Sequence, residues 1–436
     1  MHCSSSFVTA CGGLMSRTPS SPPSNLRGMS NAAAAPTITH AEFRARRDRL
    51  LAELGQSAGL VLAGDADPSL HHPWKPHAHF EYLTGVTDEP GAMLFLDPTN
   101  PVPAKRATLL LRPLNPEVEK WDGFRDELGG ALRTRTGIDT VLRTGMLSRL
   151  LLEATRRTRS LACLMPLAAW NSPVSADLAI LRAQAERVPG TQVTDRSDLL
   201  LKMRAAKSAA EIACIREAGR ITATGFAAAM KSMRAGMNEF DLQEAVEHAY
   251  RSNGARELAF RTIAGGGFNA TVLHYHANDH ALMAGELVVL DSGAKFAGYS
   301  ADVTRTLPVS GTFTPRQREL YDLVLRSQAA AISAVKPGAT LAEIDAAGRK
   351  VIVDAGYGDA FIHGMGHHLG LETHDASPDA PLEIGAVITI EPGIYLPKES
   401  VGIRIEDDVA VTATGHEVLT PSIPRSAEDV ERAMAR

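Results

Sequence analysis

The chain has 436 residues, of which 44% are hydrophobic and 22% are charged, and its formal net charge is −5. This length exceeds a single ordinary hydrophobic core, so we expect two domains. The mild negative charge and the lack of a basic run argue against nucleic-acid binding. No apolar run reaches the roughly 18 residues that span a membrane. The four cysteines are far apart and form no metal-binding spacing, which fits a reducing cytoplasm.

The amino-terminal part divides into a tail and a mixed α/β region. Residues 1–39 are rich in Ser, Pro, Asn and Ala, so we expect a disordered tail. Residues 40–196 are predicted to form an α/β domain. Its expected helices cover 41–54, 146–157 and 175–187, and its expected strands cover 59–63, 92–96 and 108–111. No acid, base and nucleophile converge there at a recognisable spacing.

Residues 197–436 are predicted to form the second domain. A linker over 197–204 leads into a long helix, whose start carries a capping box made by Ser208 and Glu211. The expected helices cover 207–233, 238–251, 315–335 and 341–355. A long helix, a short helix and then strands occur twice in this order, which indicates an internal pseudo-repeat.

Two predicted strands in this domain each carry an aspartate at one end. The apolar run 286–290 is followed by Asp291, and the β-branched run 303–307 is preceded by Asp302. Side chains of a strand alternate between the two faces of a sheet. If the two runs pair as a hairpin, the two aspartates can come opposite each other on one face.

Two later strands repeat this design with glutamates. The apolar run 386–390 ends at Glu391, before a Pro-Gly turn. The alternating run 402–409 places Arg404 and Glu406 on one face and isoleucines on the other. Four strands are therefore expected to contribute one carboxylate each.

A cluster of four carboxylates needs cations. Two unit charges ~4 Å apart repel by about 4 kcal/mol at an effective dielectric constant near 20, and two divalent ions would cancel four negative charges. The glycine-rich stretch 363–370 lies between the two pairs of acids and supplies imidazole. Oxygen ligands with one nitrogen favour Mn²⁺, Co²⁺, Fe²⁺ or Zn²⁺. The residues themselves thus predict a two-metal hydrolase site.

The strings HGMGHHLGLETH, TIEPGIY and GIRIEDDV resemble those of the pita-bread metallopeptidases, and most of all those of prolidases and Xaa-Pro aminopeptidases. This resemblance implies an α+β pita-bread catalytic domain, the creatinase/aminopeptidase fold, over 197–436. Residues 79–85 and 88–90 are similar to the amino-terminal α/β domain of Xaa-Pro aminopeptidases. Methionine aminopeptidase, another member of the superfamily, lacks that domain.

The resemblance also implies a ligand set. The family ligands are Asp, Asp, His, Glu and Glu in chain order, and they fall here on Asp291, Asp302, His367, Glu391 and Glu406. Two divalent ions are implied, with Mn²⁺ expected and Co²⁺, Fe²⁺ or Zn²⁺ as alternatives. Asp302 and Glu406 would bridge both ions. A metal-bridging hydroxide would attack the peptide bond, and Glu391 would take the proton of the water.

Further residues are assigned to the substrate by the same resemblance. His274, His363 and His374 would contact the substrate and take part in catalysis, and imidazole suits proton transfer at neutral pH. Tyr395 and Arg404 would line the substrate side, and Arg404 would also steady the carboxylates. A packing role for Tyr395, a structural role for His274, and orientation of the metal ligands by His363 and His374 stay open.

Other histidines are expected to be structural. His368 should point away from the metals, and a structural role is preferred for His276 and His280.

The leading functional hypothesis is a cytoplasmic Xaa-Pro aminopeptidase that removes the first residue from peptides with proline in second position. The family implies a homodimer or homotetramer, and no nucleic-acid or membrane partner is expected. A prolidase, which accepts only dipeptides, is the main alternative. A metal-free peptide-binding relative is disfavoured by the intact ligand set. Cleavage of a non-peptide C–N bond is disfavoured because creatinase lacks these carboxylates.

Overall fold

The computed structural model describes residues 35–66 and 74–435. Pro36–Arg436 forms one compact unit. The tail predicted over 1–39 lies outside the described residues except for 35–39, where Thr39 accepts a hydrogen bond that caps the first helix. Among the described helices, none combines the length and the apolar character that crossing a membrane requires.

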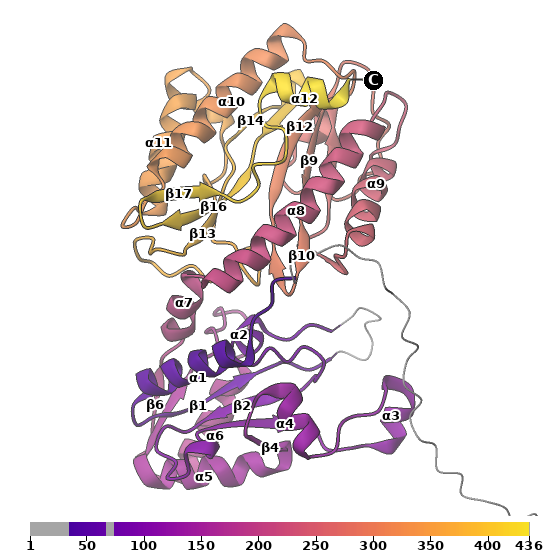
Figure 1. Cartoon of the computed structure of the whole chain (residues 1–436). Helices are drawn as coiled ribbons and strands as arrows, with labels where there is room; N and C mark the ends of the chain where they lie inside the picture. The colour runs from indigo at the N-terminus through magenta and orange to yellow at the C-terminus, as the bar shows by residue number, and fades with distance from the viewer. Residues whose placement is uncertain (1–34, 67–73, 436) are drawn as a thin grey trace, which may run out of the picture. The chain divides into compact units, whose positions relative to one another are not determined.

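The amino-terminal domain contains a six-stranded sheet in the order β4-β3-β2-β1-β5-β6 (Figure 1). Its strands are β1 (Ala58–Leu62), β2 (Met93–Leu96), β3 (Ala107–Leu111), β4 (Thr140–Arg143), β5 (Ser160–Cys163) and β6 (Gln192–Asp195). Its helices are α1 (His40–Leu54), α2 (Ala78–Thr84), α3 (Pro116–Asp122), α4 (Gly130–Thr136), α5 (Leu147–Thr158) and α6 (Ala176–Arg187). Strand β1 pairs antiparallel with β2 and parallel with β5, so the sheet is mixed.

Alternating side chains of this sheet enter two different cores. Val61 belongs to a buried cluster with Leu50 of α1, whereas Leu60 belongs to a separate cluster with Leu151 of α5 and Leu181 of α6. Because successive strand residues point to opposite faces, helices cover both sides of the sheet. The α/β prediction for this region is confirmed, and the three predicted helices and three predicted strands are present.

The segment predicted as a linker is helical. Helix α7 (Asp198–Ala205) occupies it. Asp198 lies in its first turn and Arg204 in its last turn, where each complements the helix dipole. Leu199, Leu200 and Met203 form a buried stripe, which stabilises this short helix by packing.

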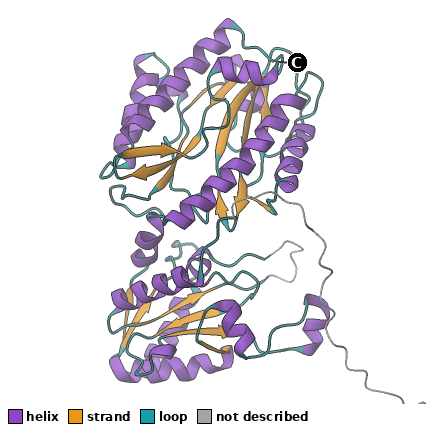
Figure 2. Cartoon of the chain, viewed as in Figure 1, coloured by secondary structure: helices purple, strands orange, loops and turns teal. Residues whose placement is uncertain are grey.

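The region after α7 is α+β, with long helices outside and small sheets inside (Figure 2). Its helices are α8 (Ala209–Ser232), α9 (Glu239–Ser252), α10 (Pro315–Ala334), α11 (Leu341–Asp354) and α12 (Ala427–Met434). Four of them begin with capping boxes, whose N-cap residues are Ser208, Asn238, Thr314 and Thr340. A long and a shorter helix precede the strands in each half, as the predicted pseudo-repeat requires.

Several short sheets lie within this region. Their strands are β7 (Glu257–Leu258), β8 (Ile263–Gly266), β9 (Leu287–Ser292), β10 (Ala294–Phe296), β11 (Tyr299–Ser300), β12 (Val303–Pro308), β13 (Val387–Ile390), β14 (Gly393–Leu396), β15 (Val401–Arg404), β16 (Asp407–Thr412) and β17 (Gly415–Val418). The strand orders are β12-β9-β8, β11-β10-β7, β13-β16-β17 and β14-β15. These strand ends position the predicted metal ligands.

The predicted pairing of the two aspartate-bearing strands is confirmed in direction and corrected in register. Strands β9 and β12 are antiparallel, but the residue opposite Asp291 is Thr304. Asp302 precedes Thr304 by two residues and so shares its face. The two aspartates therefore lie diagonally on one face.

The run predicted as one strand over 402–409 divides into two. Strand β15 pairs with β14, and β16 pairs with β13. Ile405 and Glu406 lie at the crossing between the two sheets, where the Glu406 N–H donates to the Thr304 carbonyl over 3.0 Å. The break places Glu406 beside β12.

Candidate metal centre

One cavity of about 690 Å³ brings together the residues that the sequence singled out. All five predicted metal ligands line it, namely Asp291, Asp302, His367, Glu391 and Glu406. His274, His363, His374 and Arg404 line it as well. Of the predicted site residues, Tyr395 alone is not part of its wall, so the cavity gathers residues separated by more than a hundred positions in the chain.

The ligand atoms are close enough to share ions. Asp302, His367 and Glu406 each offer one atom within 4.8 Å of the others. The Nε2 atom of His367 lies 3.5 Å from Asp302 Oδ2 and 3.7 Å from Glu391 Oε1. Divalent ions bind oxygen and nitrogen ligands at about 2.0–2.2 Å, so a cation between such atoms can touch several of them.

Local backbone features place His367 in this group. A Cβ atom on Gly366 would lie 1.9 Å from the Thr389 carbonyl oxygen, so only glycine allows the backbone to lie this close to strand β13. The His367 N–H donates to Thr389 Oγ1 over 3.1 Å, and the Thr389 N–H donates to the His367 carbonyl over 2.9 Å. Glu391 follows the same strand and reaches the same cavity.

The carboxylates are hard to ionise together. Burial, with repulsion from neighbouring carboxylates, raises the pKa of Asp291 and of Glu391 to about 7, although Arg404 opposes both shifts. Burial and repulsion by Asp302 raise the pKa of Glu406 well above its ordinary range. Burial opposes the charge of His367, but the hydrogen bond and charge of Asp302 and the charge of Glu391 outweigh it and raise its pKa to about 9.

These residues fit divalent cations. Asp291 Oδ1 is buried and has no hydrogen-bond partner among the described residues, so it is an acceptor in need of a partner. Four carboxylates and one imidazole match the oxygen-rich ligand sets of Mn²⁺, Co²⁺, Fe²⁺ and Zn²⁺ sites. Positive ions would also remove the repulsion that raises the pKa values of the acids.

Arg404 donates hydrogen bonds at one side of the carboxylate cluster. Its Nη2 atom donates to Asp291 Oδ2 over 2.7 Å, and its Nε atom donates to Thr304 Oγ1 over 3.0 Å. Thr304 Oγ1 in turn donates to Glu406 Oε2 over 2.7 Å. Arg404 thus fixes two carboxylates, one directly and one through Thr304, which supports the expectation that it steadies them.

Tyr395 links Arg404 to His363. Its hydroxyl oxygen accepts from Arg404 Nη1 over 3.0 Å and lies 2.9 Å from His363 Nε2. The other ring nitrogen of His363 lies 2.8 Å from the Gly364 carbonyl, an acceptor that requires an N–H there. The hydroxyl therefore donates to Nε2, and both ring nitrogens are engaged. Burial and the charge of Arg404 lower the pKa of His363 to about 4, in agreement with a neutral ring.

The remaining histidines divide into accessible and internal ones. His374 stacks on the His367 ring with 3.9 Å between centroids, and His274 stacks on His276 at 6.3 Å. All four rings line the cavity, including His276, for which a structural role was preferred. Residues 272–279 form no regular helix or strand. His368 is buried and outside the cavity wall, as expected.

Sequence reasoning did not identify two residues that support the ligands. Thr304 lies opposite Asp291, and its position two residues after Asp302 could have indicated the shared face. Asp408 accepts from the Asp302 N–H over 3.3 Å and is completely buried. The sequence does not single out Asp408, because it directly follows two other acids, Glu406 and Asp407.

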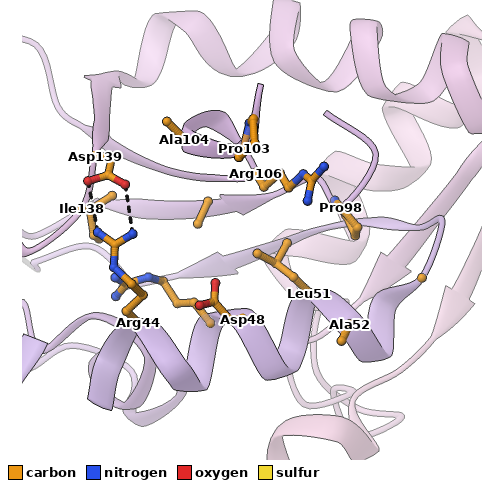
Figure 3. Close-up of a pocket in the computed structure, with 13 residues that line it drawn as sticks. Arg44, Asp48, Leu51, Ala52, Pro98, Pro103, Ala104, Arg106, Ile138 and Asp139 are labelled. Atoms are coloured by element: carbon orange, nitrogen blue, oxygen red, sulfur yellow. Dashed lines mark hydrogen bonds and ion pairs between the residues drawn. The ribbon is translucent and has the colours of Figure 1, made fainter. Parts of the chain in front are cut away.

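A second cavity, of about 560 Å³, lies in the amino-terminal domain (Figure 3). Arg44 and Asp48 of α1 line it together with Asp139. Arg44 donates two hydrogen bonds of 3.1 Å to Asp139 and so neutralises its charge. None of the predicted site residues lines this cavity.

Known protein families match both the amino-terminal part of the chain and the part that contains the metal centre. The family model of the metallopeptidase family M24 matches residues 213–413, and that of the aminopeptidase P N-terminal domain matches residues 43–162. The Xaa-Pro aminopeptidase of Haemophilus influenzae is 31% identical over 428 residues, which cover 90% of this chain and 97% of that protein. The Xaa-Pro dipeptidase of Pyrococcus furiosus is 40% identical over 228 residues, which cover 51% of this chain and 65% of that protein. The solved structure of a putative aminopeptidase P from Bacillus anthracis superposes with a TM-score of 0.85 at 31% identity, covering 91% of this chain and 98% of that one.

Proposed function

This chain belongs to the Xaa-Pro aminopeptidase family of M24 metallopeptidases, and we propose that five side chains of its central cavity hold two divalent metal ions. They are Asp291, Asp302, His367, Glu391 and Glu406. The protein is a metal-dependent aminopeptidase of this family. The observation that carries the proposed site is the convergence of all five side chains, from separate strands and loops, on one cavity.

We assign the reaction to the bond that joins the first residue of a peptide to a following proline. Such a bond lacks the N–H donor that ordinary peptidases use. The relatives that align over nearly the whole chain bear the name Xaa-Pro aminopeptidase. The Pyrococcus furiosus dipeptidase aligns over 51% of the chain, so dipeptide specificity stays the second candidate.

The bound ions would activate a water as nucleophile and stabilise the negative charge on the attacked carbonyl. Among the predicted metal ligands whose carboxylates form ion pairs, Glu391 is the most accessible, with 19% of its side chain exposed against 11% for Asp291 and 6% for Asp302. Glu391 is therefore the carboxylate best placed to accept the proton of the attacking water.

The histidines act on the substrate in two ways. The accessible rings of His274 and His374 can donate to the substrate carbonyl and to the developing negative charge. His363 has both ring nitrogens engaged, so we assign it to the wall of the cavity rather than to proton transfer. This assignment departs from the catalytic role that the family resemblance implied for it.

Three finer points belong to the same proposal. Mn²⁺ is the proposed ion, because oxygen ligands dominate the set. Cys163 and Cys214 are free and buried, as thiols of cytoplasmic proteins are, which supports a cytoplasmic location. A homodimer or homotetramer rests on the family resemblance alone.

Hydrolysis of a matched peptide set by the Mn²⁺-loaded protein tests the proposal. The set contains Ala-Pro, Ala-Pro-Gly, a longer Ala-Pro peptide and Ala-Ala controls. We expect cleavage of the tripeptide and the longer peptide, with a loss of at least about a hundredfold in Glu391→Ala, because general-base contributions reach about 10²–10⁴. Glu399→Ala, which removes a carboxylate from an exposed ion pair, is the matched control. Activity confined to Ala-Pro would favour the dipeptidase, and no cleavage at all would contradict the peptidase.

A further inference from the structure

The metal-centre cavity contains two lysines that the mechanism does not use. Lys75 and Lys295 both line it, together with an apolar wall that includes Phe260, Ile263 and Leu273. Neither ammonium group forms an ion pair with the five metal ligands among the described residues. They therefore lie in a part of the cavity that the metal centre leaves free.

Lys75 and Lys295 contribute to the wall of the same cavity. Burial and the charge of Lys75 both lower the pKa of Lys295, so the two positive charges repel each other. Lys295 Nζ donates to the Leu371 carbonyl over 2.7 Å, and no carboxylate of the described residues forms an ion pair with it. A partly buried cation without an ion-pair partner favours an incoming anion.

Glu81, Glu257 and Glu372 offset part of this positive charge, but none of these three described residues forms an ion pair with Lys295. Lys75 forms an ion pair with Glu257 at 2.6 Å, and both side chains are about half exposed. Glu372 forms an ion pair with Arg204, whose Nη2 atom lies 2.7 Å from it and also pairs with Asp375. The charge of Lys295 lowers the pKa of Glu81, but burial has the larger effect and raises it, which disfavours the charge of this carboxyl.

The position of Lys295 sets the scale of the ligand. Asp291 is the penultimate residue of β9 and Lys295 lies four residues later in β10, a span of at most ~13 Å at about 3.3 Å per residue. An extended peptide of two to four residues covers the same span. Lys295 is thus within reach of a substrate chain that continues beyond the proline, and Lys75 lines the same cavity.

An adjoining cavity begins at the same two lysines. It measures about 520 Å³, and Phe43, Trp74 and Phe296 contribute to its wall. Lys75 and Lys295 line both cavities, so they mark the junction between them. A longer peptide can continue from the metal-centre cavity into this adjoining cavity.

We propose that Lys75 and Lys295 form a subsite that binds the free carboxylate of short peptide substrates, one or more residues beyond the proline. This inference rests on the proposed function and adds a determinant of substrate length to it. A dipeptide ends at the proline itself and places its carboxylate next to the cleaved bond. The subsite therefore favours tripeptides and slightly longer free acids over the same peptides with amidated ends.

The test compares free-acid and amidated forms of Ala-Pro, Ala-Pro-Gly and Ala-Pro-Gly-Gly with the Mn²⁺-loaded full chain. For the tripeptide or the tetrapeptide, we expect the wild type to have a higher kcat/KM with the free acid than with the corresponding amide. Lys75→Met and Lys295→Met should lower that kcat/KM by about three- to tenfold, as expected for loss of one charge-assisted hydrogen bond. Cleavage of the amides and of Ala-Pro should stay within about twofold. Lys398→Met, which removes an exposed lysine outside the cavity, is the control.

A variant that is expected to increase the preference for the free acid separates recognition of the carboxylate from a general loss of structure. Glu257→Gln removes the carboxylate that competes for Lys75, so it should increase the preference for the free acid. Lys75 is half exposed, so its variant keeps the test valid if Lys295→Met does not fold. An unchanged ratio of acid to amide cleavage in the lysine variants would overturn the subsite while leaving the proposed function intact. A wild type that cleaves none of the peptides would overturn both.

Discussion

At the scale of single residues, the site depends on how a few buried polar groups restrict one another. Arg404 donates to Asp291, to Thr304 and to Tyr395, and each of these contacts is 3.0 Å or shorter. A guanidinium presents its donors in a fixed planar fork, which a flexible lysine cannot reproduce. The positions of the carboxylates are therefore set before any cation or substrate binds.

Tyr395→Phe tests this chain of hydrogen bonds. The substitution leaves His363 Nε2 without its donor and Arg404 Nη1 without its acceptor. We expect kcat/KM for Ala-Pro-Gly to fall by about tenfold, which corresponds to roughly 1.4 kcal/mol, while the metal content stays unchanged. Tyr357→Phe, which removes a hydroxyl that accepts from Arg316 outside the cavity, is the control. Equal kinetics for Tyr395→Phe and the wild type would show that the Tyr395 hydroxyl is not needed to hold the ring of His363.

At this same scale, the sequence supports some assignments and not others. The five predicted ligands all line one cavity. They could be predicted because both their residue types and their positions in the strand pattern identify them. The ring nitrogens of His363 have partners from Gly364 and Tyr395, and no periodic pattern could reveal the second contact, since it joins positions 32 apart. The lysines of the proposed subsite have no motif around them.

At the scale of elements, glycines allow strands and loops to approach within the reach of their ligands. A Cβ atom on Gly293 would lie 1.8 Å from the Ala301 carbonyl oxygen, and one on Gly402 would lie 1.9 Å from that of Ala270. Gly293 directly follows β9, which carries Asp291, and Gly402 lies within β15, which carries Arg404. Replacement of either would push its strand away from the cavity.

Gly366→Ala shows the size of this effect at the ligand His367. The new methyl group would overlap the backbone of β13, and overpacking of this kind costs about 1–3 kcal/mol or more in the free energy of unfolding. Gly364→Ala is the matched control, since a Cβ atom there meets nothing within 4 Å. Urea unfolding should show the loss for Gly366→Ala only. Equal stability of the two variants would mean that the loop can shift without cost.

Element prediction succeeded where patterns were long and failed where they were short. The helices with capping boxes were identified to within a few residues, because a cap and a repeating apolar face agree there. Helix α7 was missed because a buried stripe of three residues is a weak signal. The run through Glu406 looks like one strand, yet tertiary pairing with two different sheets divides it.

At the scale of the whole described unit, a buried ionic network joins the two sequence regions. Arg204 of α7 contacts His79 of α2 at 2.9 Å and also pairs with Asp375. Asp375 accepts from Lys207 at 3.1 Å and follows His374, the residue stacked on His367. Breaking a buried pair of this kind costs about 3–5 kcal/mol. The amino-terminal domain therefore helps to hold the loop that borders the metal centre.

The most direct test of the central claim is metal binding measured together with hydrolysis. The protein is freed of metal with a chelator and titrated with Mn²⁺, while bound ions per chain and Ala-Pro-Gly cleavage are recorded. We expect no cleavage without metal and full activity as two ions bind to each chain. Asp302→Asn removes one ligand shared by the cluster. It should bind fewer ions and lose more than about a hundredfold in activity, the upper figure for residues that only support ligands. Undiminished cleavage in the presence of chelator, or two bound ions and full activity in Asp302→Asn, would contradict the account.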